Sequence, residues 1–322
     1  MSGIVMGGHS LGSVPLAFVL IAPLFVSLAL TFGIEKTCVL IGLFDHPGER
    51  KMQKQPVPRM GGLGFLASAL FFGLILSVHV PFNFVLGAVI VFIGGFYDDM
   101  KNSNTVVSKL VFQIPAALIF SVYTDLGYLG AMGPGVFLIR LLIFALVFFM
   151  TNAANLMDNM NGLTSGLSCL IILGLSAVAL LSEQFDLALL GVLVAMSVLG
   201  FLVRNFPFGK IFMGDQGSQF LGYFLAAFAI LVLPSAFRGS HLEMIGETTL
   251  VVLLLFMLFF YDVFSVVMIR LKEKRSPFVG DQCHISHRLV RKGLTPTQAA
   301  LFLQGVQGLI VTGVVVFIEL FH

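Results

Sequence analysis

Long continuous runs of apolar residues, separated by short polar segments, dominate the pattern of this chain. The runs do not alternate polar and apolar positions, so each predicts a helix and not a strand of a membrane barrel. A helix that crosses a bilayer needs about 20 mostly apolar residues. The sequence therefore predicts ten spans, at about residues 15–35, 61–80, 82–97, 106–123, 136–153, 163–182, 186–203, 217–235, 248–269 and 298–319.

The composition agrees with this pattern. Of the 322 residues, 58% are hydrophobic and 11% are charged, and the mean hydropathy is +1.02. A soluble core cannot bury so much apolar surface, so we predict one all-α, polytopic membrane domain over residues 1–322, and no nucleic-acid partner. No Lys or Arg precedes Lys36, so the first run lacks the basic region of a signal peptide and is expected to be a retained helix.

Lys and Arg are distributed unequally between the two sets of connecting segments. Ten spans place the segments near 36–60, 98–109, 154–162, 204–216 and 270–297 on one face. All but two of the 18 Lys and Arg residues lie there, and the exceptions are Arg140 and Arg238. The positive-inside rule makes this face cytoplasmic and puts both termini on the other side.

The segment GGFYDDMKN (94–102) ends the third predicted span with two adjacent acids. Neighbouring side chains on a helix point about 100° apart, so Asp98 and Asp99 can face different groups, such as a metal ion and a substrate. An ordinary polar helix end is the alternative interpretation. Acids at a helix C-terminus oppose the helix dipole, which weakens that alternative.

A second polar segment, TNAANLMDNMNG (151–162), places Asn152, Asn155 and Asp158 at steps of three. On a helix these side chains lie along one face over about 9 Å, a stripe that suits a cation or a diphosphate. The alternative is a helix end followed by a turn at NMNG, which Asn and Gly favour.

The segment NFPFGKIFMGDQGS (205–218) places Asp215 between two glycines before an apolar run. Gly214 and Gly217 permit close backbone approach, and Ser218 is expected to cap the eighth span. Free amides at that helix start would suit a phosphate, and Asp215 could hold Mg²⁺ through its oxygens. A simple capping turn would explain the Gly and Ser residues alone.

The segment GDQCHISHRLVRKG (280–293) spaces His284 and His287 by three beside Arg288. Histidines and arginines together suit an anionic diphosphate. A zinc site with Cys283 and Asp281 is a weaker alternative because of the cationic flank. A solvated basic loop at the lipid surface is the non-functional interpretation.

One further acid, Asp262, lies inside the ninth predicted span. An acid at that depth is expected to face the bundle interior or a polar cavity, which makes it a candidate functional residue. The four polar segments fall on the same predicted face, and together they are more specific than any one alone.

At this point the chain resembles the polyprenyl-phosphate N-acetylhexosamine-1-phosphate transferase family. The similar segments are DHPGERKMQKQPVPRMGG (45–62), YDDM with Lys109 and Gln113 downstream, NAANLMD with NGL, NFPFGKIFMGDQGS and HISHRL. The family often has His, Gly and Asp where this chain has Gln53, Asn159 and Asn161. The last difference removes a carboxylate, so no catalytic role is assigned to Asn161.

The resemblance implies that a polyprenyl (undecaprenyl) phosphate attacks the sugar-bearing phosphorus of a UDP-N-acetylhexosamine, which releases UMP and starts a cell-envelope glycopolymer. It implies that the protein lies in a bacterial-type plasma membrane, that it uses Mg²⁺ or Mn²⁺ as a substitute, and that it can form a homodimer. The expected metal ligands are Asp215 and Asn155. The expected catalytic residues are Asp98, Asp99, Asp158, His284 and His287, and the expected substrate-binding residues are Lys109, Asn205, Phe212 and Arg288.

Two alternatives remain open from the sequence. HISHRL resembles the branch that transfers N-acetylglucosamine 1-phosphate, whereas the phospho-N-acetylmuramoyl-pentapeptide branch usually has a denser run of histidines followed by an acid. A transporter or flippase of phosphorylated lipids would also use an acid such as Asp262 within a span. The clustering of polar segments on one face disfavours the transporter.

Overall fold

A computed structural model describes residues 5–6, 9–10, 16–47, 53, 55–101, 106–127, 133–276 and 282–321. Helices form almost all of its regular structure, which confirms the predicted all-α class. In these residues the strands are two short antiparallel pairs, β1 (Val5–Met6) with β2 (His9–Ser10) and β3 (Phe44–Asp45) with β4 (Val57–Pro58). The helices are α1 (Leu16–Ile41), α2 (Gly62–Ile75), α3 (Phe82–Lys101), α4 (Val106–Tyr123), α5 (Gly135–Met157), α6 (Leu163–Leu181), α7 (Phe185–Asn205), α8 (Asp215–Val232), the 3-10 helix η2 (Leu233–Ala236), α9 (His241–Leu255), α10 (Met257–Lys272), α11 (Ile285–Arg291) and α12 (Pro296–Phe321).

Seven helices in the described part of the chain are long and apolar enough to cross a membrane, namely α1, α3, α5, α6, α7, α8 and α12. The bent pair of α9 and α10 makes an eighth candidate, while α2 and α4 are shorter apolar helices. Each of the ten predicted segments therefore folds as helix. The helix in the segment predicted over 61–80 is shorter than expected, because α2 has 14 residues and ends before a turn where Ser77 has a positive φ of 51°.

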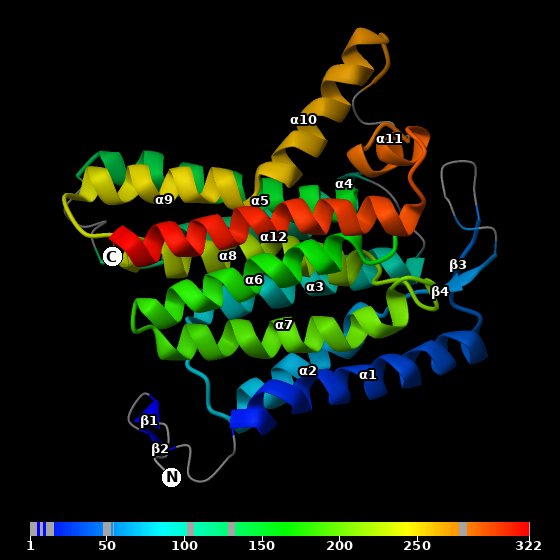
Figure 1. Cartoon of the computed structure of the whole chain (residues 1–322), viewed down its shortest axis with the longest axis horizontal. Coiled ribbons are helices and arrows are strands. Elements are labelled where there is room, and N and C mark those ends of the chain that lie inside the picture. The colour runs from blue at the N-terminus through cyan, green and yellow to red at the C-terminus, as the bar shows by residue number, and fades with distance from the viewer. Residues whose placement is uncertain are drawn as a thin grey trace.

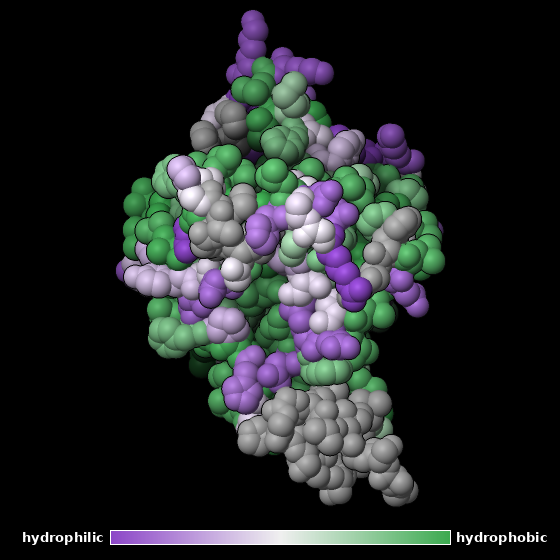
Figure 2. Space-filling view, turned by 90° about the vertical axis from the view of Figure 1, so that its left-hand side faces the viewer, coloured by the Kyte–Doolittle hydropathy of each residue, from purple (hydrophilic) through white to green (hydrophobic). Residues whose placement is uncertain are grey.

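The long helices lie side by side in a bundle with α8 near its centre (Figure 1). The apolar stretch of α8 is 89% buried, compared with 17% for α1 and 28% for α12. Large apolar side chains such as Leu40, Phe137 and Leu309 are exposed on the outer helices, where a bilayer would cover them. Figure 2 faces the end of the bundle opposite to β3, β4 and α11, where polar side chains lie among hydrophobic ones.

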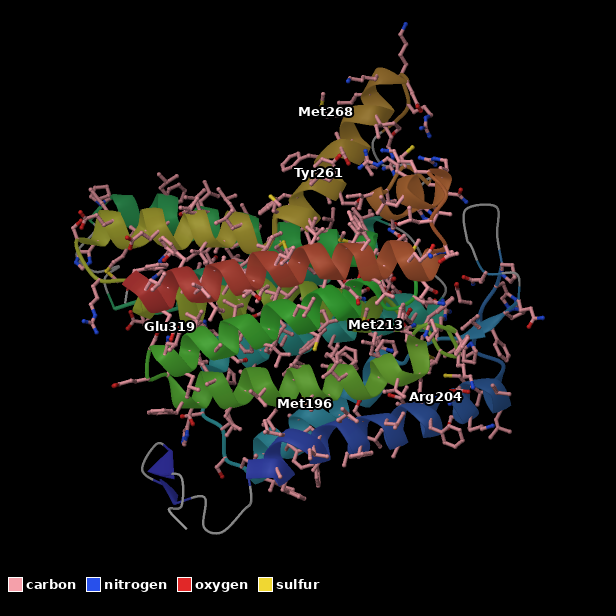
Figure 3. All side chains as sticks on the ribbon, in the orientation of Figure 1. Met196, Arg204, Met213, Tyr261, Met268 and Glu319 are labelled. Carbon is pink, nitrogen blue, oxygen red and sulfur yellow. The ribbon has the colours of Figure 1, made fainter. Side chains whose placement is uncertain are left out.

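The ninth predicted span is broken. A bend of 67° separates α9 from α10, and α10 leaves the bundle with Tyr261 and Met268 along its length (Figures 1 and 3). The break frees a backbone carbonyl at Leu255, and the side chain of Gln307 in α12 donates to it at 3.0 Å. A buried polar partner of this kind allows a helix to bend within a bundle.

The connecting segments are sorted between the two ends of the bundle. The β3–β4 pair, α11 and the α7–α8 connection lie at one end, while the start of α1 and the end of α12 lie at the other (Figure 1). The start of α1 and the end of α12 are therefore at the same end of the bundle. The segments rich in Lys and Arg lie on the opposite side.

Candidate active site

A cleft of about 890 Å³ opens at the end of the bundle that carries β3, β4 and α11. Its walls come from the β3–β4 segment, the C-terminal ends of α3 and α5, the α7–α8 connection and the start of α11. Nine of the eleven predicted site residues line it: Asp98, Asp99, Asn155, Asp158, Asn205, Phe212, Asp215, His284 and His287. Polar segments that are far apart in the sequence therefore meet in one pocket.

Asp99 holds the start of α8. Its two carboxylate oxygens accept hydrogen bonds from the backbone N–H groups of Asp215 and Gln216, each at 3.1 Å. The two N–H groups at the start of a helix have no partner within the helix, and an anion there also interacts favourably with the helix dipole. The prediction that Ser218 caps α8 is wrong, because the helix begins earlier, at Asp215. These two amides are also not free for a phosphate.

Two glycines make this arrangement possible. A Cβ atom on Gly95 of α3 would lie 2.4 Å from the Cα atom of Gln216, so only glycine lets α3 approach the start of α8 so closely. Gly214 has a φ of 83°, and a Cβ atom there would lie 2.6 Å from an oxygen of Asp99. The sequence Gly-Asp-Gln-Gly thus allows Asp215 to lie in the pocket, next to the capped start of α8.

Asp98 points to a different helix, as the divergence of neighbouring helical side chains predicts. Its Oδ1 atom accepts a hydrogen bond from Ser108 of α4 at 2.6 Å. Within the described residues, its buried Oδ2 atom has no hydrogen-bond partner. A buried carboxylate oxygen without a donor is costly in a purely structural role, so Asp98 is the stronger candidate for chemistry of the two acids.

Asp215, Asn155 and Lys109 form a compact polar cluster. The Lys109 Nζ atom lies 2.8 Å from Asp215 Oδ2 and 2.8 Å from Asn155 Oδ1. The Asn155 amide donates to Asp215 Oδ1 at 3.0 Å and to Ser218 Oγ at 2.8 Å. Lys109 is not among the residues that line the cleft itself, and it contacts the two that were predicted as metal ligands.

Asp158 follows the last residue of α5 and lines the cleft, whereas Asn152 faces the bundle and donates to Gln113 at 2.8 Å. The predicted stripe along α5 is therefore divided between the cleft and the interior. Burial, together with the negative charges of Asp215 and Asp99, raises the pKa of Asp158 to about 8. Its neutral form consequently predominates below that pH when no cation is bound.

Asn205 forms hydrogen bonds with two loops beside the cleft, the one after α5 and the one after α7. Its Oδ1 atom accepts from the Gly162 amide at 2.6 Å, and its Nδ2 atom donates to the carbonyl of Ile211 at 2.9 Å. Asn161 donates to the Pro207 carbonyl at 3.1 Å and so has a structural contact at the position that departs from the family. Phe212 is half-buried in the cleft wall.

His284 is held by the intramembrane acid that the sequence singled out. Asp262 Oδ2 lies 2.6 Å from His284 Nδ1, and Asp262 Oδ1 accepts from the Ile285 amide at 2.7 Å. Asp262 is 1% exposed. A carboxylate on Nδ1 fixes the orientation of an imidazole and favours a proton on that nitrogen, which leaves Nε2 for a ligand in the cleft.

The structure does not bring Arg288 into the cleft. Its guanidinium donates to Ser265 at 2.8 Å and lies 5.3 Å from the ring centroid of Tyr261, so it packs on α10. Arg288 follows His284 by four residues, and both side chains contact α10, His284 through Asp262 and Arg288 through Ser265. Among the described residues, no group of three or more His, Cys, Asp or Glu side chains is suited to a metal ion, so nothing there supports Cys283, His284 and His287 as a zinc set. Asp281 lies outside the described residues.

Arg59 and Lys210 also line the cleft but were not singled out from the sequence. Backbone pairing explains how Arg59 arrives there, because the Phe212 amide donates to the Pro58 carbonyl at 2.8 Å and draws β4 against the α7–α8 connection. The first polar loop carries several cations, and no local pattern distinguishes Arg59 from the others.

We expect Asp262→Asn to lower any activity that depends on His284 by about tenfold, the lower end of the range for removing the partner that orients a metal-binding histidine. The amide leaves His284 free to rotate and to change tautomer. Turnover, KM and the pH profile should be measured together, with Glu273→Gln on the exposed end of α10 as the control. An unchanged pH profile and turnover would contradict the assignment of Asp262 as a positioning residue.

The fold and the cleft define a class: an all-α, multi-pass membrane protein with an acid- and amide-lined pocket at one end of its bundle. The chain matches the model of glycosyl transferase family 4 over residues 81–233. It is 29% identical to a probable undecaprenyl-phosphate N-acetylglucosaminyl 1-phosphate transferase of Bacillus subtilis (strain 168), over 94% of this chain and 86% of the relative.

Two further relatives are similar over most of their length. A decaprenyl-phosphate N-acetylglucosaminephosphotransferase of Mycobacterium tuberculosis (strain ATCC 25618 / H37Rv) is 30% identical over 85% of this chain and 75% of the relative. An undecaprenyl-phosphate alpha-N-acetylglucosaminyl 1-phosphate transferase of Escherichia coli (strain K12) is 27% identical over 87% and 77%. The chain belongs to glycosyl transferase family 4, the family of polyprenyl-phosphate N-acetylhexosamine-1-phosphate transferases.

Proposed function

We propose that this protein transfers N-acetylglucosamine 1-phosphate from UDP-N-acetylglucosamine to a polyprenyl phosphate. The observation that carries the proposal is the similarity, over most of the chain, to relatives named for this transfer. A polar cleft at the end of a membrane bundle agrees with it, because the phosphate of a membrane-bound lipid lies at that level while its tail stays in the bilayer.

The chemistry exchanges one phosphoanhydride for another. An oxygen of the lipid phosphate forms a bond to the sugar-bearing phosphorus, and the bond from that phosphorus to UMP breaks. The two reactants are both anions, so cationic groups must offset their repulsion and the charge of the leaving UMP. Arg59 and Lys109 provide positive charge, and His284 and His287 provide polar nitrogens at the cleft wall.

Asp98 is our candidate for contact with the lipid phosphate. Its buried Oδ2 atom has no hydrogen-bond partner in the described residues. A phosphate monoester is already largely ionised near neutral pH, so orienting the nucleophile is as important here as removing its proton. Phe212, half-buried in the cleft wall, presents a ring on which uracil can stack, while Asn205 shapes the adjoining loop.

The residues present fit a magnesium ion. Oxygens of Asp215 and Asn155 already converge on one cation, the ammonium of Lys109, at 2.8 Å. Mg²⁺ commonly uses one or two carboxylates and takes its remaining ligands from water and substrate phosphates. Asp215 and Asn155 would hold it, and when bound it would neutralise charge on the transferring diphosphate.

Donor choice tests the proposed branch. We expect UDP-N-acetylglucosamine to be used at least about tenfold better than UDP-N-acetylmuramoyl-pentapeptide, a difference of about 1.4 kcal/mol in transition-state binding. Both donors should compete over one preparation of purified protein with undecaprenyl phosphate and Mg²⁺. Preferential use of the pentapeptide donor would move the protein to the peptidoglycan branch, and binding without any UMP release would favour a transporter.

We also propose that the cleft faces the cytoplasm, where nucleotide sugars are found. The support is the concentration of Lys and Arg in segments at the cleft end. Reporter fusions at His322 should therefore be active only when the reporter works outside the cytoplasm. A C-terminal reporter that works only in the cytoplasm would reverse this orientation.

A further inference from the structure

The ammonium of Lys109 lies where a bound cation would lie. Its Nζ atom is 2.8 Å from Asp215 Oδ2 and 2.8 Å from Asn155 Oδ1, and the Lys109 and Asp215 side chains are only 19% and 25% exposed. The amide of Asn155 is fixed in turn by Asp215 Oδ1 and Ser218 Oγ. The ammonium of Lys109 thus offsets the negative charge of the Asp215 carboxylate, which would otherwise lack a counter-ion at the membrane edge.

The same two oxygens are the ligands that we propose for the divalent cation. An ammonium contacts them at hydrogen-bond distance, whereas Mg²⁺ needs oxygens at about 2.0–2.1 Å in a near-octahedral arrangement. Two cations a few ångströms apart also repel each other strongly in a partly buried site. Lys109 and a divalent cation therefore compete for these oxygens.

We propose, on the basis of the proposed function, that Lys109 is an internal counter-ion of Asp215 that a divalent cation displaces. The displaced ammonium stays beside the reacting groups. Ser108, the residue before Lys109 on α4, donates to Asp98 at 2.6 Å, so the start of α4 is anchored next to the candidate contact for the lipid phosphate. Lys109 then becomes available to an anionic phosphate.

The exchange links two binding events. Cation binding frees a positive charge for the phosphate, and an anion that attracts Lys109 frees the oxygens for the cation. Each ligand should therefore raise the affinity for the other by the same factor. A lysine that only contacted the substrate would also lower the affinity of the site for a cation, through its charge. It would not change position when the cation binds.

The test is equilibrium binding of Mn²⁺ alone to the purified full chain, measured from the electron paramagnetic resonance signal of free Mn²⁺. We expect Lys109→Met to bind Mn²⁺ about tenfold more tightly than the wild type, because the competing ammonium is gone. Lys210→Met is the matched control, since Lys210 is an exposed lysine that lines the same cleft. It should change the affinity by less than about twofold because exposed charges are screened.

A second measurement needs no variant. Acetylation of Lys109 in the wild-type protein, followed by mass spectrometry, should become several-fold faster when Mn²⁺ is added, with Lys210 as the internal reference. Unchanged or weaker Mn²⁺ binding by Lys109→Met, an equal gain in Lys210→Met, or no change in the acetylation of Lys109 would overturn the proposal. Undiminished Mn²⁺ binding by Asp215→Asn would instead overturn the metal site of the proposed function, so the two failures are distinguishable.

Discussion

Replacement of Asp215 by asparagine should lower phosphosugar transfer by at least about a hundredfold while the protein stays folded. Asparagine keeps the shape of the side chain and can still accept a hydrogen bond, but it removes the negative charge that attracts a divalent cation. The loss should persist at saturating donor. The measurement is UMP release across a Mg²⁺ titration in a reconstituted bilayer.

Asp125→Asn is a suitable control for that experiment. Asp125 is exposed at the turn after α4, where it accepts a hydrogen bond from the Gly127 amide. Its replacement should leave transfer within about twofold of the wild type, as is usual for surface changes away from special features. Near-normal transfer by Asp215→Asn at low Mg²⁺ would refute the role assigned to Asp215.

The adjacent acids Asp98 and Asp99 should give opposite results when each is changed to asparagine. Asp98→Asn should reduce transfer by about 10²–10⁴-fold, the range for losing a group that orients or accepts a proton, with little change in thermal stability. Asp99→Asn should instead destabilise the protein by about 0.5–2 kcal/mol, because an amide cannot accept both backbone hydrogen bonds at the start of α8.

Asp99→Asn should also weaken Mn²⁺ binding, since the helix start that it releases carries Asp215. Thermal unfolding in detergent, Mn²⁺ affinity and transfer should be measured on both variants. A normal unfolding temperature and normal Mn²⁺ affinity for Asp99→Asn, combined with lost transfer, would show that Asp99 takes part in the chemistry. Full transfer by Asp98→Asn would remove Asp98 from it.

The positions of the helices follow from local patterns. A long apolar run inside a membrane has no water to pair with its backbone groups, so it must pair them internally as a helix. All ten runs fold as helix. The bend between α9 and α10 was not predictable in this way. Phe256 is not a helix breaker, and the partner of the freed Leu255 carbonyl, Gln307, lies 52 residues further along the chain.

The chemical types at the site were also predictable, because acids and amides at a membrane edge are expensive unless they have partners. Their individual tasks were not. Asp98 and Asp99 are the same residue type at adjacent positions, and only the approach of α8 past Gly95 gives Asp99 a structural contact. Arg288 was expected to contact the diphosphate, but its contacts with Ser265 and Tyr261 of α10 join residues of two different helices and could not be read from a local pattern.

The most direct test of the proposed function is to identify which chemical group is transferred to the lipid. UDP-N-acetylglucosamine labelled with ³²P on the sugar-bearing phosphate and with ³H in the sugar should be incubated with the purified protein, undecaprenyl phosphate and Mg²⁺. Both labels should enter the lipid product in equal amounts, with one unlabelled UMP released for each product formed. Incorporation of ³H without ³²P, or movement of lipid with no release of UMP, would contradict transfer of N-acetylglucosamine 1-phosphate by this protein.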